Sequence, residues 1–459
     1  MKKLERRALL CLVLAGCLLA GLVLFVVLWT VRGEHWASSA FNRHLYNNQG
    51  ILMSGTVLDR NGEVLTTVDE DGNRVYVGDK TRRTSTLHAV GDLYGNISTG
   101  ALSAFAQKLT GYNLFFGAFG AEQGGNNLYL TIDAGLNEVA YQALNGKKGT
   151  VAVYNYKTGE LLCMVSAPTF DIADPPELPE APGDAWDGVY INRFISSTYT
   201  PGSIFKLVTA QAAIEEIPDI YSRRFTCEGS IELPGGEIRC SGVHGEIGFD
   251  EALAYSCNVA FAEIAVELGE DTLTGYAEKA GVTDSFSFSR MTTARGSFDV
   301  SDTTDSELAW AGIGQYTDLV NPCGFMVYMG AVANDGVAVY PSLVEKTTNA
   351  IGLSFPLGDP KNQTRMMPSA TARKLKQMMR NNVESYYGQE NFPGLKICAK
   401  SGTAELSSGS EPHSVFAGFL DDSEHPYAFV VIAENAGAGR GVAGSVANAV
   451  LQKAVQLAE

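Results

Sequence analysis

The chain is short of basic residues. Among its 459 residues there are 34 lysines and arginines against 51 aspartates and glutamates, a formal net charge of -17. Binding of DNA or RNA requires a basic face that contacts phosphates, so this balance argues against a nucleic-acid partner. The sequence also lacks the Walker A pattern of phosphate-binding loops and the H-E-x-x-H pattern of zinc proteases, so neither chemistry is expected.

Long uncharged runs are also scarce, and the longest lies near the N-terminus. Residues 8–31 carry no charge over 24 positions, enough to span a hydrocarbon core of about 30 Å. Four basic residues precede this run and Glu34 follows it, which predicts a cytoplasmic N-terminus and a chain that continues outside the membrane. One alternative is a cleaved signal peptide, whose apolar core would be shorter. Another is a lipoprotein processed at Cys17, the last residue of the box at 14–17, after which polar residues would be expected.

Cysteine is present, and six of the eight cysteines follow the apolar run. Cys227 and Cys240 flank the turn signal at 233–236, so we expect a hairpin that pairs them as a disulfide. His244 lies four residues further on and suggests zinc, but no fourth ligand is evident and the spacing fits no standard site. We therefore expect no metal and no cofactor.

The order of the sequence patterns predicts an α+β fold. A chain of this length exceeds one ordinary domain, and 45% hydrophobic residues is typical of a folded protein. We expect a cytoplasmic stub and transmembrane anchor at 1–31, an N-terminal pedestal domain at 32–146 and a second domain at 147–459. Within the second domain a strand hairpin, a helical middle and three C-terminal strands predict an antiparallel sheet flanked by helices.

Ser203 and Lys206 stand at the start of an apolar-striped helix. Pro201-Gly202 breaks the chain before them, so Ser203 falls in the first turn, where free N–H groups and the helix dipole stabilise negative charge. Spacing of three places Lys206 on the same face. A desolvated lysine near other cations loses its proton near neutral pH and acts as a general base. The alternative is a capping serine beside an unrelated surface lysine.

Two further motifs follow the serine along the chain. The pattern S-x-N occurs once, at 256–258, and K-S-G followed by threonine stands at 400–403, at the end of a strand-like run. Gly402 allows a substrate backbone to approach the strand, and the hydroxyls of Ser401 and Thr403 are suited to hold a carboxylate.

Each of these residues also has a structural interpretation. Asn258 could cap the helix that follows it, and Lys400 could be a solvated charge at a strand end. A second K-T-G pattern, at 157–159, precedes the serine and is assigned to a hairpin turn. The functional interpretation depends on three motifs that occur together and in this order.

The ordered set S-x-x-K, S-x-N and K-[ST]-G resembles the penicilloyl serine transferases, which comprise the penicillin-binding proteins and the serine β-lactamases. More narrowly, the chain resembles a class B penicillin-binding protein of the penicillin-binding protein A type over essentially its whole length. The anchor, the hairpin at 54–67 and the G-I-G-Q run at 312–315 carry this likeness. Three positions depart from it: Ser54 replaces an arginine, Cys257 fills the middle of S-x-N, and Ser401 replaces a threonine.

The resemblance implies a peptidoglycan D,D-transpeptidase that cross-links stem peptides ending in D-Ala-D-Ala and that β-lactams inhibit covalently. By this likeness Ser203 attacks the penultimate D-Ala carbonyl and neutral Lys206 accepts its proton. Ser256, together with Lys400, passes a proton to the leaving D-Ala. Asn258 orients Lys206 and the peptide amide.

The resemblance also implies the substrate contacts and the partners. Ser401, Gly402 and Thr403 form the substrate-binding strand, with the two hydroxyls on the terminal carboxylate, and the backbone N–H groups of Ser203 and Thr403 form the oxyanion hole. An amine of a second stem peptide resolves the acyl-enzyme. The implied location is the bacterial plasma membrane, crossed once, with the catalytic domain outside and a glycosyltransferase of the elongation or division machinery as partner.

Three alternatives remain open for the function. A serine β-lactamase needs a deacylating glutamate, and the E-x-x-L-N pattern that would supply it is absent between Asn258 and Lys400. A membrane β-lactam sensor usually has more membrane segments and a cytoplasmic signalling part. A non-catalytic penicillin-binding scaffold would tolerate loss of Ser203 or Lys206, and both are present.

Overall fold

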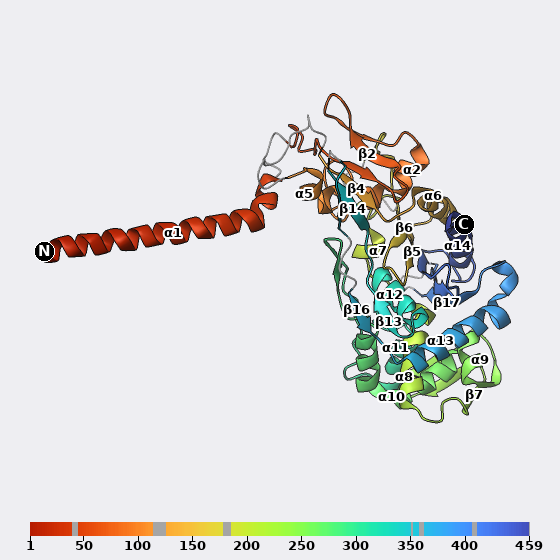
Figure 1. The fold of residues 1–459 in the computed structure, drawn as a ribbon. Helices are drawn as coiled ribbons and strands as arrows, with labels where there is room; N and C mark the ends of the chain where they lie inside the picture. Colours follow the sequence, from red (N-terminus) through yellow and green to blue (C-terminus); the bar gives the residue numbers. More distant parts are fainter. Residues whose placement is uncertain are drawn as a thin grey trace.

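The computed structural model describes residues 1–38, 45–112, 125–177, 185–349, 352–357, 362–405 and 411–458. Helix α1 (Lys2–Ala37) projects away from the body formed by the rest of the described chain (Figure 1). Within the described residues it is the one helix whose length and apolar composition suit a membrane span. The predicted span at 8–31 lies inside it.

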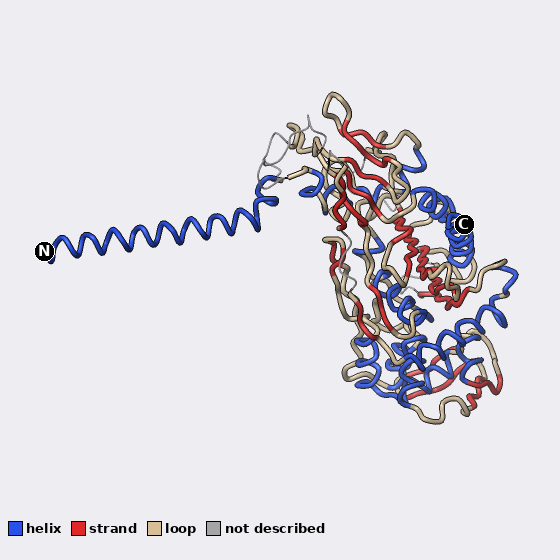
Figure 2. The backbone as a smooth tube through the Cα atoms, in the orientation of Figure 1, coloured by secondary structure: helices blue, strands red, loops and turns tan. Residues whose placement is uncertain are grey.

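The other helices belong to the body. Several of them gather at the end of the body that lies at the bottom of Figure 2. Their bounds are α2 (Lys80–Ser85), α3 (Leu87–Val90), α4 (Ala101–Ala104), α5 (Ala106–Leu109), α6 (Ala134–Leu144), α7 (Arg193–Ser196), α8 (Lys206–Glu216), α9 (Phe249–Ala254), α10 (Asn258–Lys279), α11 (Asp305–Gly312), α12 (Pro322–Ala333), α13 (Ser369–Asn382) and α14 (Val442–Ala458).

A five-stranded antiparallel sheet forms the centre of the body, in the order β17-β18-β19-β5-β6. The predicted hairpin supplies β5 and β6, and the predicted C-terminal meander supplies the other three strands. The predicted α+β fold with an antiparallel sheet is therefore confirmed. The strand bounds are β5 (Gly149–Asn155), β6 (Leu161–Ala167), β17 (Ile397–Ala404), β18 (His413–Leu420) and β19 (Tyr427–Ala433).

Both faces of this sheet are buried under helices. Successive side chains of a strand point to opposite faces, so Val151 and Val153 of β5 pack into the apolar cluster of α6 and α14. Ala152 and Tyr154 point the other way and pack into the larger cluster that contains α8 and α12. All four side chains are essentially inaccessible to solvent. The two helical layers fix the sheet, and with it the edge strand β17.

A second sheet, of order β15-β14-β4-β1-β2-β3, lies toward α1. The hairpin predicted at 54–67 is present as β1 and β2. Two strands, β14 and β15, come from beyond residue 340, so the N-terminal region completes its sheet with distant chain. The division at residues 146 and 147 stays a prediction. The bounds are β1 (Thr56–Leu58), β2 (Val64–Val68), β3 (Arg74–Tyr76), β4 (Asn127–Leu130), β14 (Val344–Thr348) and β15 (Ser354–Pro356).

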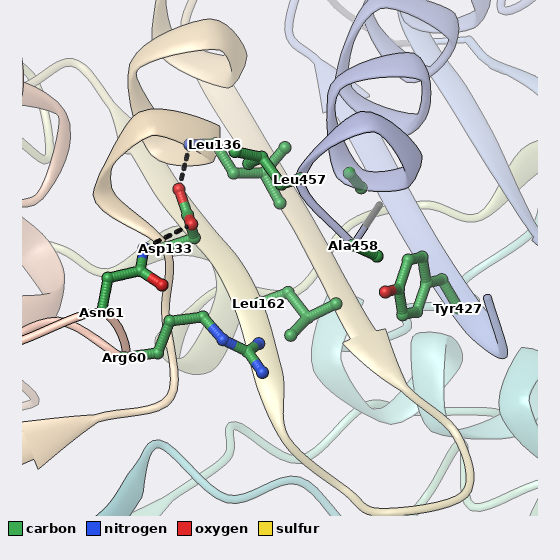
Figure 3. Close-up of a pocket in the computed structure, with 9 residues that line it drawn as sticks. Arg60, Asn61, Asp133, Leu136, Leu162, Tyr427, Leu457 and Ala458 are labelled. Carbon is green, nitrogen blue, oxygen red and sulfur yellow. Dashed lines mark hydrogen bonds between the residues drawn. The ribbon is translucent and has the colours of Figure 1, made fainter. Parts of the chain in front are cut away.

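The turn of the first hairpin is joined to the central body through Asp133 (Figure 3). The Asn61 side-chain amide donates a hydrogen bond of 2.8 Å to one carboxylate oxygen of Asp133. The other oxygen accepts the Leu136 backbone N–H at 2.9 Å and so caps α6. Arg60 and Tyr427 line the small pocket beside this contact. One carboxylate thus ties the N-terminal hairpin to a helix that covers the central sheet.

Four small two-stranded sheets complete the described strands. They are β7 (Arg224–Cys227) with β10 (Gly245–Gly248), β8 (Ser230–Leu233) with β9 (Gly236–Arg239), β11 (Ser287–Phe288) with β12 (Met291–Thr292), and β13 (Val337–Val339) with β16 (Gln363–Arg365).

The predicted disulfide between Cys227 and Cys240 is wrong in this structure. The predicted hairpin is present as β8 and β9, but Cys227 belongs to the preceding strand and pairs across the ladder with Gly245. All eight cysteines are free thiols. The hairpin therefore brings the two cysteines near one another without setting them opposite each other.

The segment that carries Ser203 is fixed by a glycine with a left-handed backbone. Gly202 has a φ of 56°, and its N–H donates to the carbonyl oxygen of Gly314 at 2.8 Å. A Cβ atom at Gly202 would lie 2.6 Å from the backbone oxygen of Thr403 on β17. Glycine is therefore required for the serine segment to lie against the edge strand.

Substitution of this glycine tests how tightly the segment is fixed. We expect Gly202→Ala to lower the free energy of unfolding by about 1–3 kcal/mol, because alanine is strained at this φ and collides with backbone. Gly275→Ala is the matched control: Gly275 lies inside α10 with open space around it and an ordinary φ, so alanine should be neutral or slightly stabilising. Chemical denaturation measures both, and equal stability of the two variants contradicts the expectation.

Candidate active site

Ser203 lies in a short 3₁₀ turn, Gly202–Ile204, that leads directly into α8. Lys206 is the first residue of α8, and its side chain is fully buried. Its ammonium group donates to the Ser203 hydroxyl oxygen at 3.1 Å. The predicted contact between the two residues is therefore present, and the alternative of an unrelated surface lysine is wrong.

The Lys206 ammonium group is surrounded by neutral oxygen atoms. It donates to the Asn258 side-chain oxygen at 2.7 Å, and it lies 2.8 Å and 3.2 Å from the backbone and hydroxyl oxygens of Ser256. Burial lowers the pKa of Lys206 to about 8, because the charged form loses its hydration. The neutral amine is therefore accessible near physiological pH, as a general base requires.

Lys400 enters the same group of side chains from β17. It is fully buried, and its ammonium group donates to the Ser256 hydroxyl at 2.9 Å and to the Ser401 carbonyl oxygen at 3.0 Å. Burial holds the pKa of Lys400 well below its usual value, and the positive charge of Lys206 lowers it further. The interpretation of Lys400 as a solvated strand-end charge is wrong.

The S-x-N residues lie where α9 passes into α10. Ser256 has a φ of 56°, and this left-handed backbone places its hydroxyl between the two lysines. Asn258 is the first residue of α10, but the cap is Cys257, whose sulfur accepts the Ala260 N–H. The Asn258 amide instead bridges Lys206 and the Arg239 carbonyl oxygen, which it reaches at 2.7 Å. The interpretation of Asn258 as a helix cap is therefore wrong.

Ser401, Gly402 and Thr403 lie on the edge strand β17, beside the serine segment. A Cβ atom at Gly402 would lie 2.8 Å from the Pro201 carbonyl oxygen, so the strand and the serine segment pack backbone to backbone. Ser401 and Thr403 are both partly exposed, and as alternate residues of one strand they share a face. Their predicted contact with a substrate carboxylate stays a prediction.

The structure adds two residues that support this strand and that the sequence did not assign to the site. The Tyr387 hydroxyl accepts the Ser401 backbone N–H at 3.0 Å and lies 3.1 Å from the Ser401 hydroxyl. The Gln315 side-chain amide donates to the Thr403 carbonyl oxygen at 2.7 Å. Gln315 belongs to the G-I-G-Q run, which carried part of the family resemblance. Nothing in the sequence around Tyr387 indicated a role in the site.

Four side chains beside the S-x-N residues have donor atoms that could hold a metal ion. The ligand atoms of Cys227, Cys240, His244 and Cys257 all lie within 4.8 Å of one another. The sequence-based statement that no fourth ligand is evident is thereby corrected. Cys257 escaped notice because it is 13 residues beyond His244 and inside another motif.

Comparison with known proteins gives the same grouping as the motifs. Residues 149–454 match the family described as penicillin binding protein transpeptidase domain. The peptidoglycan D,D-transpeptidase PbpA of Mycobacterium tuberculosis (strain ATCC 25618 / H37Rv) is 26% identical over 390 residues, which cover 77% of this chain and 78% of that protein. PbpA of Mycolicibacterium smegmatis is 27% identical over 364 residues, which cover 73% of each.

Solved structures agree with this grouping. The crystal structure of PBPA from Mycobacterium tuberculosis superposes with a TM-score of 0.75 at 25% identity, covering 88% of this chain and 99% of that chain. The match to the family includes all three motifs and more than half of the sequence. The chain therefore belongs to the penicillin binding protein transpeptidase family, as a class B penicillin-binding protein of the penicillin-binding protein A type.

Proposed function

We propose that this protein is a peptidoglycan D,D-transpeptidase that forms an acyl-enzyme on Ser203 and that β-lactams trap. The observation that carries the proposal is the contact of two buried lysines with two serine hydroxyls. Lys206 reaches both Ser203 and Ser256, and Lys400 reaches Ser256. This arrangement can move a proton away from one serine and toward a leaving group. Relatives named D,D-transpeptidases support the same activity.

In the acylation step the neutral Lys206 amine accepts the Ser203 proton as the hydroxyl oxygen attacks the penultimate D-Ala carbonyl carbon. Negative charge develops on the carbonyl oxygen, and the backbone N–H groups of Ser203 and Thr403 are proposed to stabilise it. The C–N bond to the terminal D-Ala then breaks. The leaving nitrogen takes a proton through Ser256, whose hydroxyl is hydrogen-bonded to Lys206 and Lys400.

Substrate position comes from the strand and from α10. Ser401 and Thr403 are proposed to bind the terminal carboxylate, and Gly402 leaves room for the peptide backbone. Asn258 orients Lys206 through its side-chain oxygen. An amine of a second stem peptide then attacks the acyl-enzyme, forms the cross-link and regenerates the Ser203 hydroxyl.

A β-lactam follows the same path as far as the acyl-enzyme. Opening of its ring leaves the departing nitrogen tethered to the acyl group, where it obstructs an incoming amine. A β-lactamase would need a glutamate that activates water, and the sequence pattern for it is absent between the second and third motifs. The adduct should therefore persist.

Acylation by penicillin tests the proposal directly. Intact-mass analysis of the full-length protein in detergent should show one penicilloyl group, located on the peptide that contains Ser203 and absent in Ser203→Ala. Lys206→Ala should slow adduct formation by about 10²–10⁴-fold, the usual effect of losing a general base. Lys157→Ala is the control, because that lysine belongs to the K-T-G pattern in the β5-β6 turn and contacts Asn334.

Each contrary outcome has a distinct meaning. No adduct at saturating penicillin supports the non-catalytic scaffold. Rapid release of opened drug with free enzyme regenerated supports a β-lactamase. Equal slowing by Lys157→Ala and Lys206→Ala contradicts the assignment of the base.

The Tyr387 hydroxyl gives a second test of the substrate strand. Tyr387→Phe removes the acceptor of the Ser401 N–H and the neighbour of its hydroxyl, at a cost of about 1 kcal/mol. We expect a several-fold loss in acylation efficiency. Because the tyrosine positions Ser401 and does not move a proton, the loss should appear in the dissociation constant for penicillin and leave the maximal acylation rate nearly unchanged. Stopped-flow acylation over a range of drug concentrations separates the two, and a loss confined to the maximal rate contradicts this role.

We further propose that α1 anchors the protein in the bacterial plasma membrane, with the N-terminus in the cytoplasm and the catalytic body outside. The basic residues before the apolar run support this orientation. A glycosyltransferase that polymerises glycan strands is the proposed partner, because cross-linking needs such strands as substrate.

The orientation is measurable in intact protoplasts of a bacterial host. With different epitope tags at the two ends of the chain, external protease should remove the C-terminal tag and leave the N-terminal tag attached to a short membrane fragment. Protoplasts lysed before treatment serve as the control for tag susceptibility. Loss of the N-terminal tag with retention of the C-terminal tag contradicts the proposal.

A further inference from the structure

We infer that Cys227, Cys240, His244 and Cys257 form a tetrahedral zinc site that fixes the S-x-N residues beside the catalytic serine. The inference concerns a metal site outside the acylation chemistry and goes beyond the proposed transpeptidase function. It stands on the convergence of three sulfurs and one imidazole, on the bonds those sulfurs accept, and on their position in the fold.

The donor atoms already have nearly the spacing of a zinc tetrahedron. Zinc binds sulfur at about 2.3 Å and histidine nitrogen at about 2.0–2.1 Å, so two sulfurs should lie about 3.8 Å apart and a sulfur and a nitrogen about 3.6 Å apart. The Cys240 and Cys257 sulfurs are 3.9 Å apart, and the Cys240 sulfur lies 3.5 Å from the His244 Nδ1 atom. All four donors lie within 4.8 Å of one another, so a metal ion needs only small side-chain shifts.

The surroundings of the sulfurs suit metal-bound thiolates. The Asn258 N–H donates to the Cys240 sulfur at 3.3 Å, and the Ala260 N–H donates to the Cys257 sulfur at 3.5 Å. Such bonds from outside the ligand set orient the ligands and hold negative charge on them. The His244 ring is stacked on Tyr255 with centroids 5.4 Å apart, which fixes its plane. Zinc binding releases the thiol protons and transfers no electrons.

The donor set distinguishes zinc from a disulfide. A disulfide joins two sulfurs by a bond of about 2.05 Å. It would not explain why the third cysteine and the imidazole lie at the same place. The Cys240 and Cys257 sulfurs lie 3.9 Å apart, and all of these cysteines are free in the structure. Three thiolates and one imidazole are a standard tetrahedral set for structural zinc. Cys240 and His244 are partly exposed, which leaves a path for the ion to enter.

The position of the site gives it a structural task. Its ligands come from β7, from the end of β9, from the following loop and from the N-terminus of α10. The sheets β7-β10 and β8-β9 have two strands each, and isolated two-stranded ribbons are only marginally stable in water.

A metal ion would join these ribbons to Cys257, which lies between Ser256 and Asn258. Strand β9 also contacts the active site directly, because the carbonyl oxygen of its last residue, Arg239, accepts the Asn258 side-chain amide. We therefore assign the four ligands as positioning residues for the two side chains that contact Lys206.

Metal analysis of the full-length protein, purified in detergent without chelators, tests the inference. Elemental mass spectrometry should find about one zinc per chain, and X-ray absorption at the zinc edge should give three sulfur neighbours and one nitrogen neighbour. In His244→Ala and in Cys240→Ser the zinc content should fall at least about tenfold. His425→Ala and Cys163→Ala are matched controls outside the cluster, and both should keep the metal.

Three outcomes overturn the inference. One is a chain without zinc in which non-reducing mass spectrometry finds a disulfide among these cysteines. Another is a protein that contains no zinc and that, after refolding in the presence of zinc, still has all three cluster cysteines open to alkylation. The last is bound zinc that persists in both ligand variants. Circular dichroism confirms that each variant is folded, and the penicillin adduct is measured separately, so failure of the zinc site and failure of the transpeptidase assignment are distinguishable.

Discussion

The site depends on two lysines buried side by side, Lys206 and Lys400, which share the Ser256 hydroxyl. Among the described residues neither ammonium group is paired with a carboxylate, and their hydrogen-bond acceptors are neutral oxygens. Keeping both lysines charged would be energetically unfavourable, because each ammonium group loses its hydration and repels the other. Burial and mutual repulsion therefore favour the neutral form of one amine. In the proposed mechanism that neutral amine accepts the Ser203 proton and so makes this serine a nucleophile.

Holding such a pair together requires a rigid frame, and the frame comes from three separate parts of the chain. The α8 segment brings Ser203 and Lys206, the edge strand β17 brings Lys400, and the start of α10 brings Ser256 and Asn258. The central sheet is buried on both faces and so cannot shift its edge strand easily. Close backbone contacts at Gly202 and Gly402 lock the serine segment against that strand.

The start of α10 is held by apolar packing, with Val259, Ala260 and Phe261 buried in the core, and also by polar contacts to sulfur. It is attached to two small ribbons, and several neighbouring polar contacts run through cysteine sulfur: Cys257 caps α10, and Cys240 accepts the Asn258 N–H. A cysteine in the middle of S-x-N therefore has a structural meaning here. It connects the catalytic motif to a cluster of sulfurs and an imidazole that lies just behind it.

The sequence alone determined much of the fold and of the site. Charge and apolar length indicated the anchor, and strand-like apolar runs predicted the hairpin and the three C-terminal strands that the structure has as β5, β6 and β17 to β19. Ser203, Lys206, Ser256, Asn258 and Lys400 were recognisable from short motifs because their chemistry requires fixed spacing along one helix turn or strand. Only the tertiary structure decided the contacts between residues far apart in sequence. It placed Tyr387 on Ser401, added β14 and β15 to the N-terminal sheet, and brought Cys257 to His244 in place of a Cys227–Cys240 disulfide. No local pattern encodes such contacts, because they depend on how separate elements pack, and packing is set by the whole chain at once.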